Sequence, residues 1–131
     1  MNTKLDKIFA EISAGELVDK ITILEIKKLK IQNKDKLTEV EKELKSLNLT
    51  FEKFIPQKDI INDLIQKLKS INLKLWDIED GKRLAEKNSD FGKNFTELAR
   101  NVYKFNDERA KIKLLINVTL GSNIKEVKSY E

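Results

Sequence analysis

The residues whose chemistry most needs an explanation lie in the stretch 101–117, NVYKFNDERAKIKLLIN. Its apolar residues recur every three or four positions, as on one face of a helix, but Arg109 occupies one of those positions. Asn106 and Lys113 lie about one helical turn away on either side of it. A guanidinium on the inner face of a helix either binds a phosphate or carboxylate bidentately or pairs with a buried polar group. We therefore expect Arg109 to lie in a polar layer between helices.

A second group of polar residues occurs in residues 75–83, LWDIEDGKR. Glu79 lies beside the apolar positions of this stretch, and Asp80 and Arg83 are one helical turn apart. Charged residues of two other predicted helices are expected at a similar height. Together the two layers supply the candidate ligand-binding residues, which are Glu25, Glu79, Asp80, Arg83, Arg100, Asn106, Arg109 and Lys113. Helix-neighbour ion pairs and register-setting buried polar groups are the structural alternative for both layers.

The composition restricts the chemistry that these residues can perform. The 131-residue chain has no Cys and no His, so it lacks thiolate ligands and the commonest catalytic base. We predict no cofactor and no metal site. The 26 basic and 22 acidic residues nearly balance, and the lysines do not alternate with aromatic residues, so no nucleic-acid surface is predicted. No apolar run approaches the roughly 20 residues of a membrane span and no signal peptide is evident, so we expect a cytoplasmic protein that is not membrane-bound.

Helical periodicity begins with a capping box in Ser13-Ala-Gly-Glu16. In such a box the Ser13 hydroxyl accepts a hydrogen bond from the Glu16 amide, and the Glu16 carboxylate reaches back to the Ser13 amide. No Gly or Pro interrupts residues 17–48, so we expect one long helix there. The alternative is a tight turn in the polar run QNKDK (32–36), which would divide this stretch into two helices.

Two more helices follow. The stretch NLTFEKFIP (48–56) is predicted to be a break, with Pro56 in the first position of the second helix. The apolar seam of that helix has regular 3-4 spacing and runs through Ile61, Leu64, Leu68, Ile71, Leu75, Ile78, Lys82 and Ala85. Residues 87–94 are predicted to be a connection, and Gly121 is predicted to stop the third helix.

The predicted fold is all-α, with residues 1–131 forming a single helical-bundle domain. Three long antiparallel helices with a short C-terminal tail are expected, or four helices if the first breaks near residue 34. In an antiparallel three-helix bundle, Arg109 lies level with the middle of the second helix and with residues 33–35 of the first. The expected partners of Arg109 are therefore Asn33, Asp35, Asn72 and Asn106.

Four blocks of the sequence carry a resemblance to a known family. They are ISAGELVDKITILEIKKLKI (12–31), LWDIED (75–80), LARNVYKFNDERAKIKLLIN (98–117) and LGSNIKEVKSY (120–130). Together they resemble a small all-helical family of bacterial and phage proteins of unknown function. The resemblance implies no activity, but it does imply that the polar blocks go together as one unit.

Three functions are compatible with these residues. The first is binding of a small anionic ligand, a phosphate or a carboxylate, in a polar pocket between helices. The second is a structural or adaptor role, in which the chain pairs through its helices with itself or with another helical protein. An inter-helix cavity lined by Arg109 and Glu79 would favour binding or catalysis, whereas a filled core would favour the adaptor.

The third is an enzyme. A magnesium-dependent nucleotide hydrolase would hold its metal with the carboxylate pairs Glu16/Asp19 and Asp77/Asp80, which have i, i+3 spacing. A chorismate-mutase-like isomerase would clamp a dicarboxylate with cations inside a helical bundle. The first helix offers only Lys where that family uses Arg.

Overall fold

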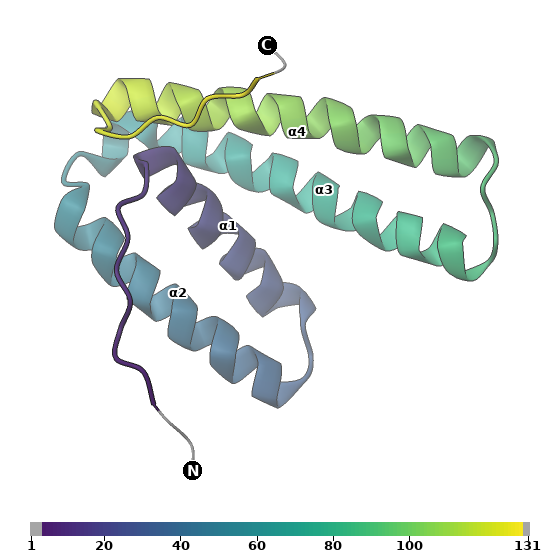
Figure 1. Cartoon of the computed structure of the whole chain (residues 1–131), viewed down its shortest axis with the longest axis horizontal. Coiled ribbons are helices and arrows are strands. Elements are labelled where there is room, and N and C mark those ends of the chain that lie inside the picture. The colour runs from purple at the N-terminus through teal and green to yellow at the C-terminus, as the bar shows by residue number, and fades with distance from the viewer. Residues whose placement is uncertain (1–3, 130–131) are drawn as a thin grey trace.

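The structure, a computed structural model, describes residues 4–129, and within this range the chain forms four α-helices and no strand. In chain order the elements are α1 (Ala14–Lys30), α2 (Lys34–Phe54), the short 3-10 helix η1 (Lys58–Ile61), α3 (Asn62–Lys87) and α4 (Lys93–Leu120). They form two antiparallel hairpins, α1–α2 and α3–α4, which diverge from the end where α1 begins and α4 ends (Figure 1). The all-α prediction is confirmed, but the three-helix bundle is wrong.

The first predicted helix is divided at residues 31–33, at the start of the polar run 32–36. Ile31 leaves α1 in an extended conformation, and the Asn33 side chain caps α2 by accepting from the Lys36 amide at 3.0 Å. Asn is among the best N-cap residues because its carbonyl satisfies a free amide of the first turn. The apolar spacing continues across the turn because the two helices double back and pack on one another. Spacing alone therefore could not distinguish one helix from two.

Helix α1 begins where the capping box predicts. The Ser13 hydroxyl accepts from the Glu16 amide at 3.1 Å. The carboxylate half of the box differs from the prediction, because the Glu16 Oε2 accepts from the Lys113 Nζ on α4 at 2.7 Å. A local capping partner has thus been replaced by a charge from another helix.

The first turn of α1 lies directly against the last turns of α4. The Gly15 amide donates to Asn117 Oδ1 at 2.6 Å, and the Ala14 amide donates to Ser122 Oγ at 3.0 Å. The amides of residues 14–16 are therefore all satisfied by side chains, two of them from the other end of the chain. This approach has no room for a side chain at Gly15, since a Cβ there would lie 2.4 Å from the Lys113 carbonyl oxygen.

Helix α4 stops at Gly121, as predicted, with this residue in the left-handed region at a φ of 65°. The Ser122 amide donates to the Asn117 carbonyl at 2.8 Å and the Gly121 amide donates to the Val118 carbonyl at 3.2 Å, which is the Schellman arrangement. The tail then turns back and runs along α4 (Figure 1).

The connection between α2 and α3 comes later than predicted. Helix α2 continues to Phe54, and Pro56 lies in the connection before η1 instead of in the first turn of a helix. Ile55 and Ile61, on either side of this connection, are 6% and 0% exposed. They belong to the main core cluster, whose other buried members are Leu17, Val18, Leu68 and Ile116. Because Ile55 and Ile61 are anchored in this core, α2 can continue to Phe54, two residues before Pro56.

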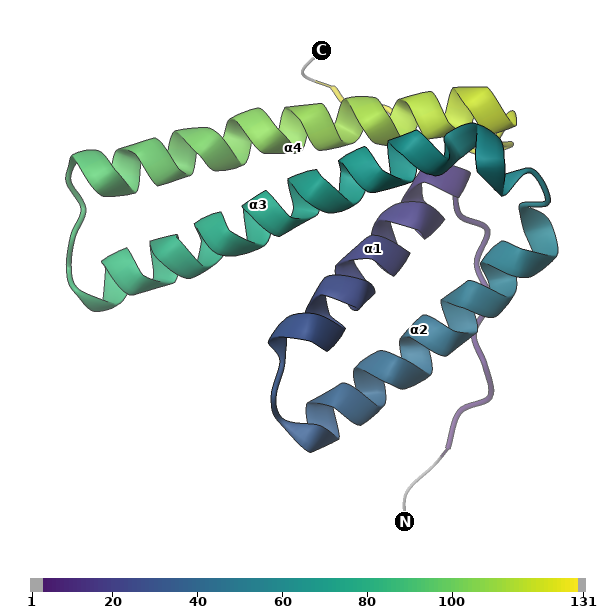
Figure 2. The same ribbon diagram turned by 180° about the vertical axis from the view of Figure 1, so that it is seen from behind.

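Helices α3 and α4 pack along their predicted seams, and Leu68, Ile71, Leu75 and Ala85 are buried. The α3–α4 hairpin nevertheless extends well beyond α1 and α2 (Figure 2), so no third helix covers its outer half. None of the helices in residues 4–129 combines the length and the apolar character needed to cross a membrane.

Gly15→Ala should destabilise the protein by about 1–3 kcal/mol, because the new methyl group would force α1 away from the α4 backbone. Gly92→Ala is the matched control, since a Cβ at Gly92 meets nothing closer than 3.8 Å. Urea unfolding of both variants gives the comparison. Equal stabilities would show that the close approach of α1 and α4 does not depend on the glycine.

Candidate functional site

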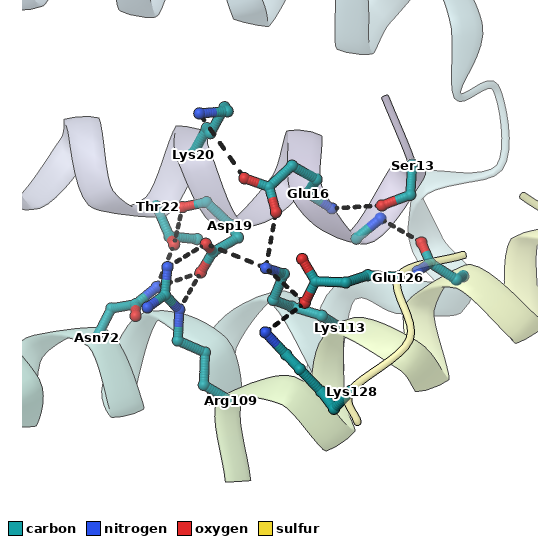
Figure 3. A network of polar contacts seen from close by, with 12 residues as sticks. Ser13, Glu16, Asp19, Lys20, Thr22, Asn72, Arg109, Lys113, Glu126 and Lys128 are labelled. Atoms are coloured by element: carbon teal, nitrogen blue, oxygen red, sulfur yellow. Dashed lines mark hydrogen bonds and ion pairs between the residues drawn. The ribbon is translucent and has the colours of Figure 1, made fainter. Parts of the chain in front are cut away.

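Arg109 binds the carboxylate of Asp19, which lies on α1. The two side chains form a bidentate pair, with Nε–Oδ1 at 2.9 Å and Nη2–Oδ2 at 2.5 Å (Figure 3). Asp19 is 1% exposed, whereas the Arg109 side chain is 28% exposed. The expectation of a polar layer around Arg109 is therefore supported, but its direct partner is a residue that the predicted register had not brought near it.

Asn72 joins the same layer through Asp19. Its Nδ2 donates to Asp19 Oδ1 and to Thr22 Oγ1, both at 2.9 Å. The Thr22 hydroxyl donates in turn to the Asp19 backbone carbonyl at 2.8 Å. Asp19 thus accepts side-chain hydrogen bonds from both α3 and α4, and the two hairpins are joined at this one carboxylate.

The expected direct bonds from Arg109 to Asn33, Asp35, Asn72 and Asn106 are wrong. Asn33 instead caps α2, and Asp35 lies in the exposed first turn of that helix. The physical reason is the turn after α1, which carries residues 33–35 away from α4 and leaves the first turns of α1 beside it.

Lys113 is the second cation of the cluster, and it is 8% exposed. Its Nζ lies 2.7 Å from Glu16, 3.8 Å from Asp19 and 3.9 Å from Glu126 of the C-terminal tail. Glu126 also pairs with Lys128 at 2.8 Å. A nearly buried ammonium is therefore surrounded by three carboxylates, and the tail is tied to the same cluster as α1 (Figure 3).

The environment of the cluster favours its ionised form. Burial alone would raise the pKa of Asp19, but the hydrogen bonds from Arg109 and Asn72 and the nearby cations outweigh it, so the pKa of Asp19 lies below its ordinary value. The hydrogen bond to Asp19 raises the pKa of Arg109. A hydrogen bond from Lys128 lowers the pKa of Glu126. All three groups remain charged at neutral pH.

A pattern in the sequence could have identified Asp19 as the partner. Gly15, Asp19, Thr22 and Ile26 have 4-3-4 spacing, which places them on one stripe of a helix, and all four are buried. The competing stripe Leu17, Ile21 and Leu24 is more apolar, and Leu24 packs against α2. Helix α1 therefore has two buried faces, and the more polar one faces the α3–α4 hairpin.

The other candidate residues do not converge on this cluster. Glu25 pairs with Lys69 at 3.6 Å, and Glu79 pairs with Lys82 at 3.7 Å along its own helix. Asn106 is half-buried, and the remaining three, Asp80, Arg83 and Arg100, are exposed. Of the eight candidates, only Arg109 and Lys113 take part in the cluster around Asp19.

The buried polar atoms of the cluster all have hydrogen-bond partners. Throughout the described residues, no buried side-chain nitrogen or oxygen lacks a hydrogen-bond partner. Nor do residues 4–129 bring together three or more acidic side chains in a group that could hold a metal ion, so the pairs Glu16/Asp19 and Asp77/Asp80 do not combine. Three of the four carboxylates proposed as magnesium ligands, Glu16, Asp19 and Asp77, instead pair with cations of this chain, and Lys30 lies 3.9 Å from Asp77.

Two shallow hollows lie elsewhere on the molecule. One, of about 390 Å³, is lined by Lys28 of α1 and by the α2 residues Glu41, Leu44, Lys45, Asn48, Leu49 and Glu52. The other, of about 350 Å³, lies between α3 and α4 and is lined by Lys67, Ser70, Ile71, Lys74, Glu108, Lys111 and Ile112. Neither hollow is lined by any of the eight candidate residues.

The fold and the cluster define an all-helical protein whose two hairpins are joined by a buried, mutually neutralising set of charges. Over residues 8–131 the chain matches a protein family described as "Family of unknown function (DUF6165)". The chain belongs to this family, which confirms the expected membership in a family of unknown function. No curated protein and no solved structure matches the chain.

Arg109→Ala should lower the free energy of unfolding by about 3–5 kcal/mol, because it leaves the buried Asp19 carboxylate without its bidentate partner. Arg100→Ala, on the exposed face of the same helix, should stay within about 0.5 kcal/mol of the parent protein. Denaturant titration measures both. Similar losses in the two variants would contradict the role of the Asp19–Arg109 pair in joining the hairpins.

Asp19 should also make the protein sensitive to acid. Because its pKa is lower in the folded chain than in the unfolded chain, its stabilising contribution is complete above the unfolded pKa of about 3.9 and is lost as the pH falls through the folded pKa. Asp19→Asn should be less stable at neutral pH but should lose less stability below about pH 4. Urea unfolding at a series of pH values tests this, and parallel curves for the two proteins would argue against it.

Proposed function

We propose that this protein is a structural or adaptor protein that associates with other protein surfaces through apolar side chains on its outside. The observation that carries this proposal is a stripe on the last turns of α4. Leu114, Leu115 and Val118 lie there within about one turn of each other and are 40%, 50% and 58% exposed. Single exposed apolar residues are normal on any protein, but a contiguous apolar patch indicates a contact surface.

The polar cluster supports the same proposal because it leaves no charge free to bind a ligand. An anion-binding or catalytic site needs charges that are free to meet a substrate. Here Arg109 and Lys113 are already neutralised by Asp19 and Glu16, and the first amides of α1 are capped by side chains. The arrangement favours a structural role for the cluster, with a filled core of the kind expected of an adaptor.

A second candidate function is binding of a small anion, and one observation favours it. The hollow between α3 and α4 carries three lysines, Lys67, Lys74 and Lys111, against one acidic residue, Glu108. A phosphate or carboxylate would find an excess of positive charge there. This place differs from the layer around Arg109 that the sequence had suggested.

The adaptor proposal predicts that the α4 stripe is dispensable for folding. Leu115→Lys and Val118→Lys should each change the free energy of unfolding by no more than about 0.5 kcal/mol, because neither exposed side chain fills the core. Ile116→Lys, at the 0% exposed position between them, is the control that should unfold the protein. Losses above about 2 kcal/mol at Leu115 or Val118 would assign the stripe to the fold and remove the basis of the proposal.

A ligand screen on the same protein separates the two candidates. The adaptor proposal expects that nucleotides, sugar phosphates and dicarboxylates, with and without magnesium, leave the thermal midpoint unchanged. A compound at 100 times its dissociation constant would stabilise the fold by about 2.7 kcal/mol. Such a shift, if abolished by Lys111→Ala, would replace the adaptor proposal by anion binding in the hollow between α3 and α4.

A further inference from the structure

The segment before α1 exposes its apolar side chains to an unusual degree. Residues 4–12 have no regular secondary structure, and Leu5, Ile8 and Phe9 are 75%, 83% and 86% exposed. The segment leads away from the start of α1 and runs past α2 without forming a helix or strand (Figures 1 and 2). Large apolar side chains so close in sequence lose favourable burial when they remain in water.

The spacing of these side chains is that of a helix. Leu5, Ile8, Phe9 and Ile12 occupy positions i, i+3, i+4 and i+7, which is one face of an α-helix and the pattern of a helix that binds in a groove. The residues between them are polar or small. An isolated helix shorter than about 12–15 residues is only marginally stable, so this segment needs a surface to fold against.

The base of the segment lies beside the residues that follow α4. Glu11 accepts a hydrogen bond from the Asn123 side chain at 2.7 Å, and the Ala14 amide donates to Ser122. Because α4 ends where α1 begins, the start of the segment and the last turns of α4 lie at the same end of the molecule (Figure 1). The tail adds Val127, which is 86% exposed.

This placement favours a second copy of the chain as the partner. When two surfaces that can bind one another lie at the same end of one molecule, a two-fold axis at that end allows both to be covered in both copies, and the contact closes on itself. The charges of the segment, two lysines against Asp6 and Glu11, sum to zero. The segment therefore adds no net charge to a contact between two copies, and it is not a basic membrane-binding or nucleic-acid-binding helix.

The segment, the α4 stripe and the tail also offer apolar surface to such a contact. Together they expose nine large apolar side chains: Leu5, Ile8, Phe9, Ile12, Leu114, Leu115, Val118, Ile124 and Val127. A standard interface buries about 800 Å² per partner, so a stable dimer would need most of these side chains to be covered.

We propose that residues 5–12 of one copy fold into an amphipathic helix on the α4 stripe of a second copy, reciprocally, so that the protein forms a two-fold dimer. This inference rests on the adaptor function and names its partner. Residues 5–10 lie outside the helices and are exposed, so substitutions at Phe9 or Ala10 leave the helical fold itself intact.

The experiment combines sedimentation equilibrium with hydrogen exchange on the full-length chain. The protein should change from monomer to dimer as its concentration rises, and the amides of residues 6–12 should become protected only in the dimer. Phe9→Asp and Leu115→Asp should each weaken the dimer at least tenfold. Ala10→Asp, on the opposite face of the proposed helix, is the matched control that should leave the dimer intact.

Several results would overturn the inference. Among them are a monomer at every concentration, protection of residues 6–12 that does not depend on concentration, and equal weakening by Ala10→Asp and Phe9→Asp. A dimer in which residues 6–12 stay unprotected also overturns it but leaves the adaptor function standing. Failure of that function is recognised separately, by a ligand-induced shift of the thermal midpoint or by unfolding of Leu115→Lys.

Discussion

The carboxylate of Asp19 lies almost completely buried between the two helical hairpins, and the rest of the structure depends on its neutralisation. A buried carboxylate without partners would be strongly unfavourable, so α1 can rest against α3 and α4 only if both supply donors. Arg109 supplies two N–H groups and Asn72 supplies one. These contacts are directional, which is why α1 has a single register against the α3–α4 hairpin instead of sliding along it.

Several other features are consequences of the same contact. Gly15 lets the α1 backbone come close enough to α4 for the Gly15 amide to donate to the Asn117 side chain. Lys113 then lies among Glu16, Asp19 and Glu126, so the tail closes over the cluster. The cluster lies beside the main apolar core of the same end, formed by Leu17, Val18, Ile55, Ile61, Leu68 and Ile116. Other apolar residues nearby, on the last turns of α4 and in the segment before α1, remain exposed.

The agreement between sequence and structure is best where a few neighbouring residues decide the conformation. The Ser13 cap, the Gly121 stop and the seam from Ile61 to Ala85 need only local hydrogen bonds or one helical face. The division at residues 31–33 was an alternative and not the first expectation, because neither Gly nor Pro marks it and Asn33 alone caps the new helix. Pro56 was predicted to begin a helix, but it lies in the connection before η1. The buried residues Ile55 and Ile61 fix the path of the chain on both sides of this connection.

The sequence by itself determined that the chain is helical, that it belongs to a family of unknown function, and that Arg109 needs a polar partner. It determined these because helix periodicity, capping and the penalty for burying a charge act over one turn or on one side chain. Only the tertiary structure decided that this partner is Asp19 and not Asp35. Residues on different helices meet according to the direction in which each helix leaves its turn, and the turn after Lys30 reverses that direction. A partner separated by 90 positions is therefore set by how the hairpins pack, which no local pattern records.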